Sequence, residues 1–350
     1  MRRVSASRAM ADLRLEYDDV EGVFAIMPTP ATDDASDPGA EYTLDEAEAR
    51  AGARKLAEDG VDAVMINGTF GEAATLTERE WKEFTRIVVE TIEEVDPSVH
   101  AIAGPTTLNT RSTIDRMQYA RGVGADGVLL GRPMWLELSE EATVEFYRHV
   151  AEAVPELGIV VYHNPPAFKN RITPAMWREL AEIDQVVAAK YGAVDVMWRD
   201  AVRQVGDRVQ LMPIERKWYL AHELAPDLAR AAWSGSAACG PLPALRLKAA
   251  IEAGDAERAR ELNRRINATN EKFYPQVGPE ATYPEAMNVR HDDLYGLYTI
   301  ALQKARIGGA GYIDPGPPRP PYHVAPDDLV EMAAESGREW RDLAEELRSE

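Results

Sequence analysis

Cysteine is almost absent from this sequence, with Cys239 as the only one in 350 residues. A single cysteine excludes an internal disulfide and fits a reducing compartment. No apolar run approaches the roughly 18 residues that a membrane-spanning helix needs. The basic start of the chain is not followed by the apolar segment of a secretory signal. We therefore expect a cytoplasmic protein without a membrane partner.

Positive charge is also scarce, because 39 Lys and Arg against 59 Asp and Glu give a net charge of −20. This balance argues against nucleic acid as a partner, since such a surface needs basic stripes. It also means that a site for an anionic substrate must be locally positive against the overall field. Most of the basic residues are arginine, so a lysine inside an apolar strand stands out.

Metal-ligand patterns are missing as well. The six histidines are scattered, and no pair has the spacing of metal ligands on one helix, so we expect no metal site. Cys239 follows an apolar strand and is interpreted as a packed small residue rather than a nucleophile.

What recurs along the chain is an apolar strand, a polar turn and an amphipathic helix. Short, continuous apolar runs suit parallel strands that are covered on both faces. Eight such strands alternating with helices predict a (β/α)₈ TIM barrel, an α/β fold, over residues 21–241. A doubly wound sheet would need a glycine-rich loop after the first strand, where Met27-Pro28-Thr29-Pro30 stands. The candidate strands are 23–27, 63–67, 99–103, 127–130, 159–162, 186–190, 209–213 and 230–234.

Residues 1–20 are interpreted as an N-terminal arm, and residues 242–350 as a helical C-terminal extension packed on the barrel. Its expected helices are 244–253, 255–273, 297–307 and 327–347, with a proline-rich connector at 308–322. Within the barrel, Thr43 and Thr77 each precede an acidic residue by three positions, which predicts that each begins a helix. Ser139 and Thr173 are further predicted helix starts.

Chemistry in such a barrel takes place at the carboxyl ends of the strands, and three of these ends are unusual. Lys190 ends an apolar strand, where burial would lower its pKa and free the amine to attack a ketone. A lysine that points to solvent or pairs with a carboxylate is about equally consistent with its position. Tyr162 ends the preceding strand and could move a proton, although a core tyrosine is the commoner role. The turn Gly68-Thr69-Phe70-Gly71-Glu72 could bind an anion, but ordinary loops use the same residues.

Together these segments resemble the dihydrodipicolinate synthase / N-acetylneuraminate lyase family over about residues 20–330. That family shares a Gly-Thr-x-Gly-Glu turn, a strand end like Tyr162-His163-Asn164-Pro165, and a Schiff-base lysine matching Lys190. The likeness is greatest to the hydratase-aldolases of polycyclic aromatic degradation. Phe70 replaces a threonine of the synthases, and Trp135 stands at the end of strand four, where the synthases carry a tyrosine of their proton relay. The segments that carry the closer likeness are 27–30, 68–72, 106–111, 131–135, 238–241 and 319–322.

The resemblance implies a lyase that condenses Lys190 with the ketone of an aryl-substituted 2-oxo-3-butenoate, adds water, and releases an aromatic aldehyde and pyruvate. By the same resemblance Tyr162 transfers protons, and Asn164 holds the water or hydroxyl. Thr69 and Phe70 bind the carboxylate, and Trp135 stacks on the ring. The iminium is the electron sink, so no cofactor is expected. The resemblance also implies a homotetramer.

The ring substituent depends on the loop that contains Arg216 and Lys217. Hydratase-aldolases that release salicylaldehyde carry an acidic stretch there, so this basic pair favours trans-2'-carboxybenzalpyruvate as substrate and 2-carboxybenzaldehyde as product. An exposed basic pair at a helix start is nearly as consistent with the sequence. Two other functions remain open: a Schiff-base aldolase or dehydratase acting on a sugar acid or other 2-oxo acid, and a catalytically silent barrel that only binds.

Overall fold

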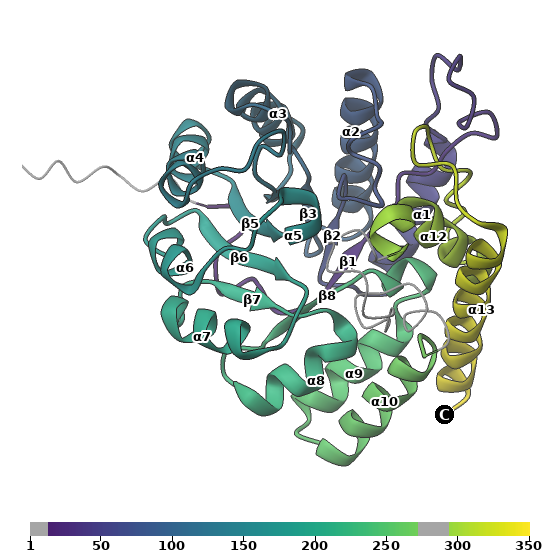
Figure 1. The fold of residues 1–350 in the computed structure, drawn as a ribbon. Coiled ribbons are helices and arrows are strands. Elements are labelled where there is room, and N and C mark those ends of the chain that lie inside the picture. Colours follow the sequence, from purple (N-terminus) through teal and green to yellow (C-terminus); the bar gives the residue numbers. More distant parts are fainter. Residues whose placement is uncertain (1–12, 272–293) are drawn as a thin grey trace, which may run out of the picture.

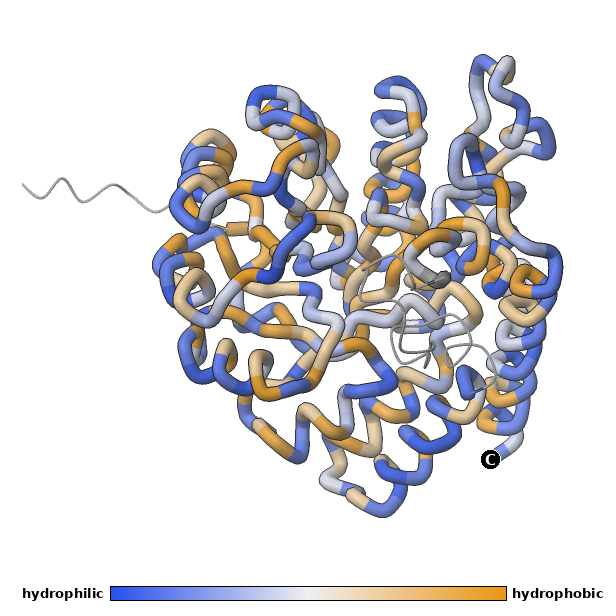
Figure 2. Tube along the Cα trace, viewed as in Figure 1, coloured by the Kyte–Doolittle hydropathy of each residue, from blue (hydrophilic) through white to orange (hydrophobic). Residues whose placement is uncertain are grey.

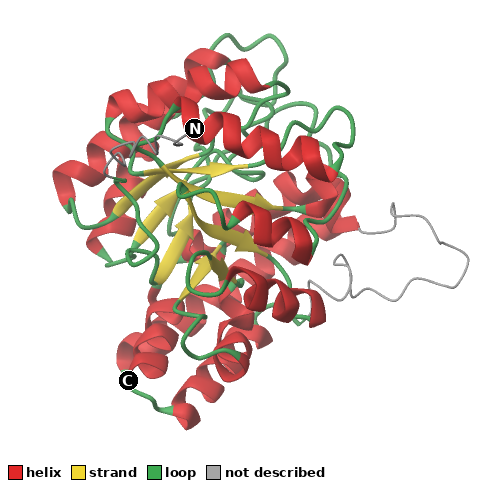
Figure 3. Cartoon of the chain, turned by 90° about the vertical axis from the view of Figure 1, so that its left-hand side faces the viewer, coloured by secondary structure: helices red, strands yellow, loops and turns green. Residues whose placement is uncertain are grey.

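Eight parallel strands stand at the centre of the computed structural model, which describes residues 13–271 and 294–350. They are hydrogen-bonded in the order β7-β6-β5-β4-β3-β2-β1-β8, and a bridge between Ile214 and Trp233 links β7 to β8. Helices surround the strands (Figures 1 and 3), so the predicted TIM barrel is confirmed. Each predicted strand lies within two residues of an observed one. The strands are β1 Gly22–Ile26, β2 Ala63–Met65, β3 His100–Ala103, β4 Gly127–Leu130, β5 Gly158–His163, β6 Val186–Tyr191, β7 Gln210–Met212 and β8 Ala231–Ser234.

The helices between the strands begin mostly where the sequence predicted. Thr77 forms a capping box with Glu80, and Ser139 and Thr173 accept hydrogen bonds from the first turns of their helices. The prediction for Thr43 is wrong, because Asp45 caps α1 and the Thr43 hydroxyl bonds to Glu80 instead. The barrel helices are α1 Glu46–Glu58, α2 Glu78–Val95, α3 Thr110–Val123, α4 Glu140–Ala153, α5 Pro165–Phe168, α6 Pro174–Leu180, α7 Val196–Val205 and α8 Glu215–Leu224.

The core forms where the inner faces of these helices meet the strands. In α2, for example, Trp81, Phe84 and Val88 are fully buried against the barrel. In Figure 2, each of these helices carries both hydrophobic and hydrophilic residues, which agrees with one buried and one exposed side. No helix among the described residues is long and apolar enough to cross a membrane.

The C-terminal part of the described chain is helical and lies against the β1–β8 side of the barrel (Figure 1). The predicted connector at 308–322 begins too early, because α12 continues through Gly308 and Gly309 to Ala310. A Cβ on Gly309 would lie 2.2 Å from the carbonyl oxygen of Ala334, so the glycine permits close packing of α12 on α13. These helices are α9 Leu242–Glu252, α10 Ala256–Ala268, α12 Leu294–Ala310 and α13 Asp327–Ser349. Residues 1–12 of the predicted arm, and the end of the predicted helix 255–273, lie outside the described residues.

Candidate active site

Lys190 lies near the carboxyl end of β6, directly opposite Tyr162 in the register with β5. Its side chain is buried, with 7% of its surface exposed. Its Nζ atom is 3.5 Å from the ring centroid of Trp233 and 4.6 Å from that of Tyr162. Two aromatic faces therefore enclose the amine and restrict its contact with water.

This environment changes the acidity of the lysine. Burial lowers the pKa of Lys190 below its usual value, although Tyr162 and Glu215 act in the opposite direction by favouring the charged amine. A lowered pKa leaves more neutral amine at neutral pH, which is the form that attacks a carbonyl carbon. The arrangement fits a nucleophilic lysine.

The Tyr162 hydroxyl belongs to a small hydrogen-bonded group. Its oxygen lies 2.8 Å from Oγ1 of Thr69, and the Asn164 amide donates to the Tyr162 oxygen at 3.2 Å and to Thr69 Oγ1 at 3.3 Å. Burial alone would raise the pKa of Tyr162, but the charge of Lys190 and the bonds from Thr69 and Asn164 outweigh it and lower the pKa. A phenol with a lowered pKa beside an amine is suited to proton transfer.

The turn 68–72 provides donors for an anion. The backbone N–H groups of Gly68, Thr69 and Phe70 donate to no backbone carbonyl within the described residues. The Phe70 ring is buried and lies close to the backbone of Gly235, so it holds its end of the turn against the loop after β8. Convergent backbone donors of this kind can bind a carboxylate.

Trp135 and Arg216 are not among the hydrogen-bonding partners of this group. β4 ends at Leu130, so Trp135 does not end the strand as the sequence analysis placed it. It lies on the following loop, with 76% of its surface exposed. Arg216 is the second residue of α8, and its carbonyl oxygen accepts a hydrogen bond of 3.0 Å from Asn267.

Three residues near the lysine were not singled out from the sequence. Trp233 was visible only as an aromatic residue inside an expected strand. Phe168 packs edge-on against Tyr162 with ring centroids 5.5 Å apart, but it lies in the short helix α5, which the sequence did not predict. Glu215 is buried, and its carboxylate accepts a 2.6 Å hydrogen bond from Ser236. In the sequence, Glu215 gave no sign of a role at the site, because it is the first of three consecutive charged residues.

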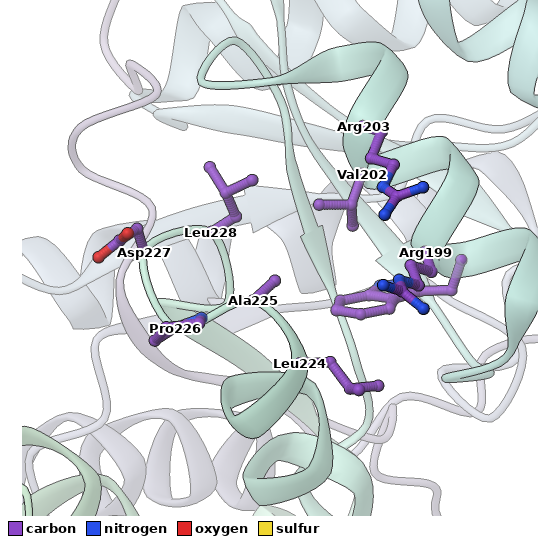
Figure 4. Close-up of a pocket in the computed structure, with 9 residues that line it drawn as sticks. Arg199, Val202, Arg203, Leu224, Ala225, Pro226, Asp227 and Leu228 are labelled. Carbon is purple, nitrogen blue, oxygen red and sulfur yellow. The ribbon is translucent and has the colours of Figure 1, made fainter.

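A separate hollow lies between α7 and the segment that joins α8 to β8 (Figure 4). Arg199 and Arg203 of α7 line it together with apolar residues such as Leu224 and Leu228. None of the residues around Lys190 takes part, so this hollow is distinct from the candidate active site. Cys239 is buried, and burial raises the pKa of its thiol to about 11, as expected for a packing residue.

Comparison with known proteins gives one family and several full-length relatives. Residues 21–281 match the dihydrodipicolinate synthetase family. The chain is 37% identical over 345 residues to the trans-O-hydroxybenzylidenepyruvate hydratase-aldolase of Sphingobium xenophagum, covering 97% of this chain and 100% of that protein. It is also 37% identical over 325 residues to the trans-2'-carboxybenzalpyruvate hydratase-aldolase of Nocardioides sp. strain KP7, covering 92% and 93%.

A solved structure agrees with these relatives. The structure described as PhdJ bound to substrate intermediate superposes with a TM-score of 0.89 at 37% identity, covering 96% of this chain and 99% of that one. The fold and the sequence therefore point to the same group of proteins.

Proposed function

The chain belongs to the dihydrodipicolinate synthetase family, and on this premise we propose that it is a Schiff-base hydratase-aldolase for aryl-substituted 2-oxo-3-butenoates. Relatives matched over almost their whole length are named hydratase-aldolases, so the chain is a carbon–carbon lyase. The observation that carries the finer proposal is the hydrogen-bonded group of Tyr162, Thr69 and Asn164 beside the buried amine of Lys190.

In the proposed reaction, Lys190 attacks the C2 ketone, water leaves, and an iminium forms. The iminium conjugates with the C3–C4 double bond and makes C4 electrophilic, so a second water adds there. Tyr162 accepts the proton of the C4 hydroxyl as the C3–C4 bond breaks and the aldehyde leaves. The electron pair of that bond passes into the enamine of pyruvate, which is protonated at C3 and hydrolysed. The lowered pKa of Tyr162 supports its role as the base.

The other groups bind rather than react. The backbone N–H groups of Thr69 and Phe70, which donate to no backbone carbonyl within the described residues, support a carboxylate site in the turn 68–72. Asn164 caps α5 without using its side chain, which bonds to Tyr162 instead, and it would hold the added water or the C4 hydroxyl.

For the aromatic end of the substrate we propose trans-2'-carboxybenzalpyruvate. The two named relatives differ in the ring substituent and are equally identical to this chain, so identity favours neither. The guanidinium of Arg216 supports the carboxylate, because arginine pairs strongly with it. Trp135, exposed on the loop after β4, would stack on the ring when substrate binds.

The proposal is tested by trapping the imine. Incubation with pyruvate and borohydride should add one reduced adduct, and mass spectrometry should map it to the peptide that contains Lys190. Lys190→Arg should abolish both the adduct and turnover while the fold is retained, because arginine stays charged and forms no imine. An adduct on Lys217 or Lys248, or turnover by the arginine variant, would contradict the assignment.

A further inference from the structure

We propose that three buried charged residues, Glu72, Lys304 and Arg319, hold the turn 68–72 in shape and supply the positive charge that retains the substrate's carboxylate. We call them the Glu72 cluster. Their exposed fractions are 0%, 2% and 3%, so all three lie in the protein interior. The inference rests on the proposed function, because it takes this turn to be the site of the 2-oxo acid's carboxylate.

The turn itself has a demanding backbone. Asn67 and Glu72, at its two ends, have φ angles of 55° and 54°, in the left-handed region that side chains other than glycine seldom adopt. Side-chain contacts therefore have to hold the ends in place. The Asn67 amide donates to Thr85 at 2.9 Å, and the Glu72 carboxylate accepts from the backbone N–H of Arg319 at 2.7 Å.

Arg319 is the main anchor of the cluster. Its guanidinium pairs with Glu72 and donates to Oγ1 and the carbonyl oxygen of Thr43, at 2.6 and 2.7 Å. Arg319 thus joins the C-terminal connector both to the turn and to the segment before α1. Because Arg319 contacts both oxygens of Glu72, it is enough by itself to balance that carboxylate.

Lys304 then brings a second positive charge to the same place. Its Nζ lies 2.6 Å from Glu72 and donates to the carbonyl oxygen of Pro317 at 2.9 Å. The three residues carry two cations and one carboxylate, a formal charge of +1, and the buried carboxylate of Glu80 reaches Arg319 only through the Thr43 hydroxyl. Burial lowers the pKa of Lys304 to about 8, with Glu72 opposing this shift, Arg319 adding to it, and the exposed Asp314 opposing it less. A buried charge in excess is unfavourable unless an anion balances it.

A carboxylate bound to the N–H groups of residues 68–70 would provide that anion, because the turn that ends at Glu72 presents these groups. The chain as a whole carries −20, so its long-range field repels an anionic substrate. The positive charge of the Glu72 cluster opposes this field beside the turn, as the sequence predicted for the site of an anionic substrate.

The test replaces the excess charge and compares two ligands. Imine formation at Lys190 is titrated with pyruvate and with pyruvamide, its neutral amide, using borohydride trapping and the intact mass. In Lys304→Met we expect the apparent affinity for pyruvate to fall roughly tenfold, as for a charge acting over about 12 Å at an effective dielectric constant of about 20. The affinity for pyruvamide should change little, because the amide carries no charge.

Lys248→Met is the matched control. Lys248 forms a 2.6 Å ion pair with Asp62, the residue before β2, at the opposite end of the barrel. The control therefore removes the same charge from the chain, and its affinities should stay near those of the wild type because distant charges are screened. Circular dichroism checks the fold, and Lys304→Gln, which keeps a donor for Pro317, replaces the methionine variant if that fails to fold.

Equal losses for pyruvate and pyruvamide would overturn the charge argument and leave the cluster a purely structural support. Unchanged affinity for pyruvate would overturn it as well. The proposed function fails in a different way, since a wild-type protein that traps neither ligand at Lys190 would not be a Schiff-base enzyme.

Discussion

Tyr162→Phe removes one oxygen from the candidate active site and keeps the aromatic ring. The hydroxyl lies 2.8 Å from Thr69 and accepts at 3.2 Å from Asn164, so two partly buried hydrogen bonds are lost, at a cost of about 1–2 kcal/mol of unfolding free energy. The proposed proton acceptor is lost with them, and general acid–base catalysis is worth roughly 10²–10⁴-fold. We expect kcat for cleavage of 2'-carboxybenzalpyruvate to fall by that factor.

The same variant should move a pH profile in a known direction. Imine formation needs the neutral amine, so its rate rises as pH increases through the pKa of Lys190, which burial already lowers. Tyr162 raises that pKa through its charge and its hydrogen bond. Without the hydroxyl, the rising limb of the pyruvate-trapping rate should move to lower pH.

Two assays follow from this: aldehyde release measured by absorbance, and borohydride trapping over a pH series. Tyr191→Phe is the control, because Tyr191 neighbours Lys190 but stacks on His163, with ring centroids 4.3 Å apart, on the outer side of the strand. Tyr191→Phe should leave unchanged both kcat and the pH at which the pyruvate-trapping rate rises. A Tyr162→Phe enzyme within about threefold of wild type would refute the reasoning, since general-base catalysis contributes far more.

Three further predictions concern the ring, its substituent and the C-terminal helices. Trp135→Ala should weaken the binding of aryl substrates by about 0.5–1.5 kcal/mol and leave pyruvate trapping unchanged. The measurement is kcat/KM for an aryl substrate divided by the trapping affinity for pyruvate, and equal losses in both would argue for a sugar-acid site. Arg216→Ala should reduce kcat/KM for the 2'-carboxy substrate far more than for the 2'-hydroxy one, and equal losses would remove the preference for 2-carboxybenzaldehyde. Gly309→Ala should lower the unfolding free energy by about 1–3 kcal/mol, because its Cβ would lie 2.2 Å from the Ala334 carbonyl. Gly308→Ala meets only Pro315 at 3.8 Å, so in thermal melts it should be neutral or stabilising, and matching losses in both variants would contradict the packing argument.

The sequence predicted the strands well because a parallel strand covered on both faces is a short, continuous apolar run between polar turns. Helix starts were less certain where two polar residues competed. Thr43 has the spacing of a capping residue, but its hydroxyl bonds to Glu80 in another helix, and Asp45 takes its place. Such long-range partners cannot be read from local spacing.

Part of the candidate site could also be predicted from the sequence. Lys190, Tyr162, Thr69 and Asn164 come from strand ends, and strand ends of one barrel meet at one face, so the prediction that they lie together followed from the fold. Trp233 and the Glu72 cluster did not follow, because their roles depend on tertiary contacts between distant segments. Nothing near Lys304 in the sequence indicates that its partner is Glu72.

The pairing of Arg319 with Glu72 has a consequence for how the protein is made. The two residues are 247 positions apart, and Glu72 is synthesised first. At about 5–20 residues per second, a ribosome reaches Arg319 roughly 12–50 seconds after Glu72. During that interval the six strands from β3 to β8 are synthesised, yet the turn between β2 and α2 lacks its partner from the connector. A nascent or truncated chain can thus complete its strands and still present an unfinished turn 68–72, so the proposed carboxylate site is completed only with the last segments of the polypeptide.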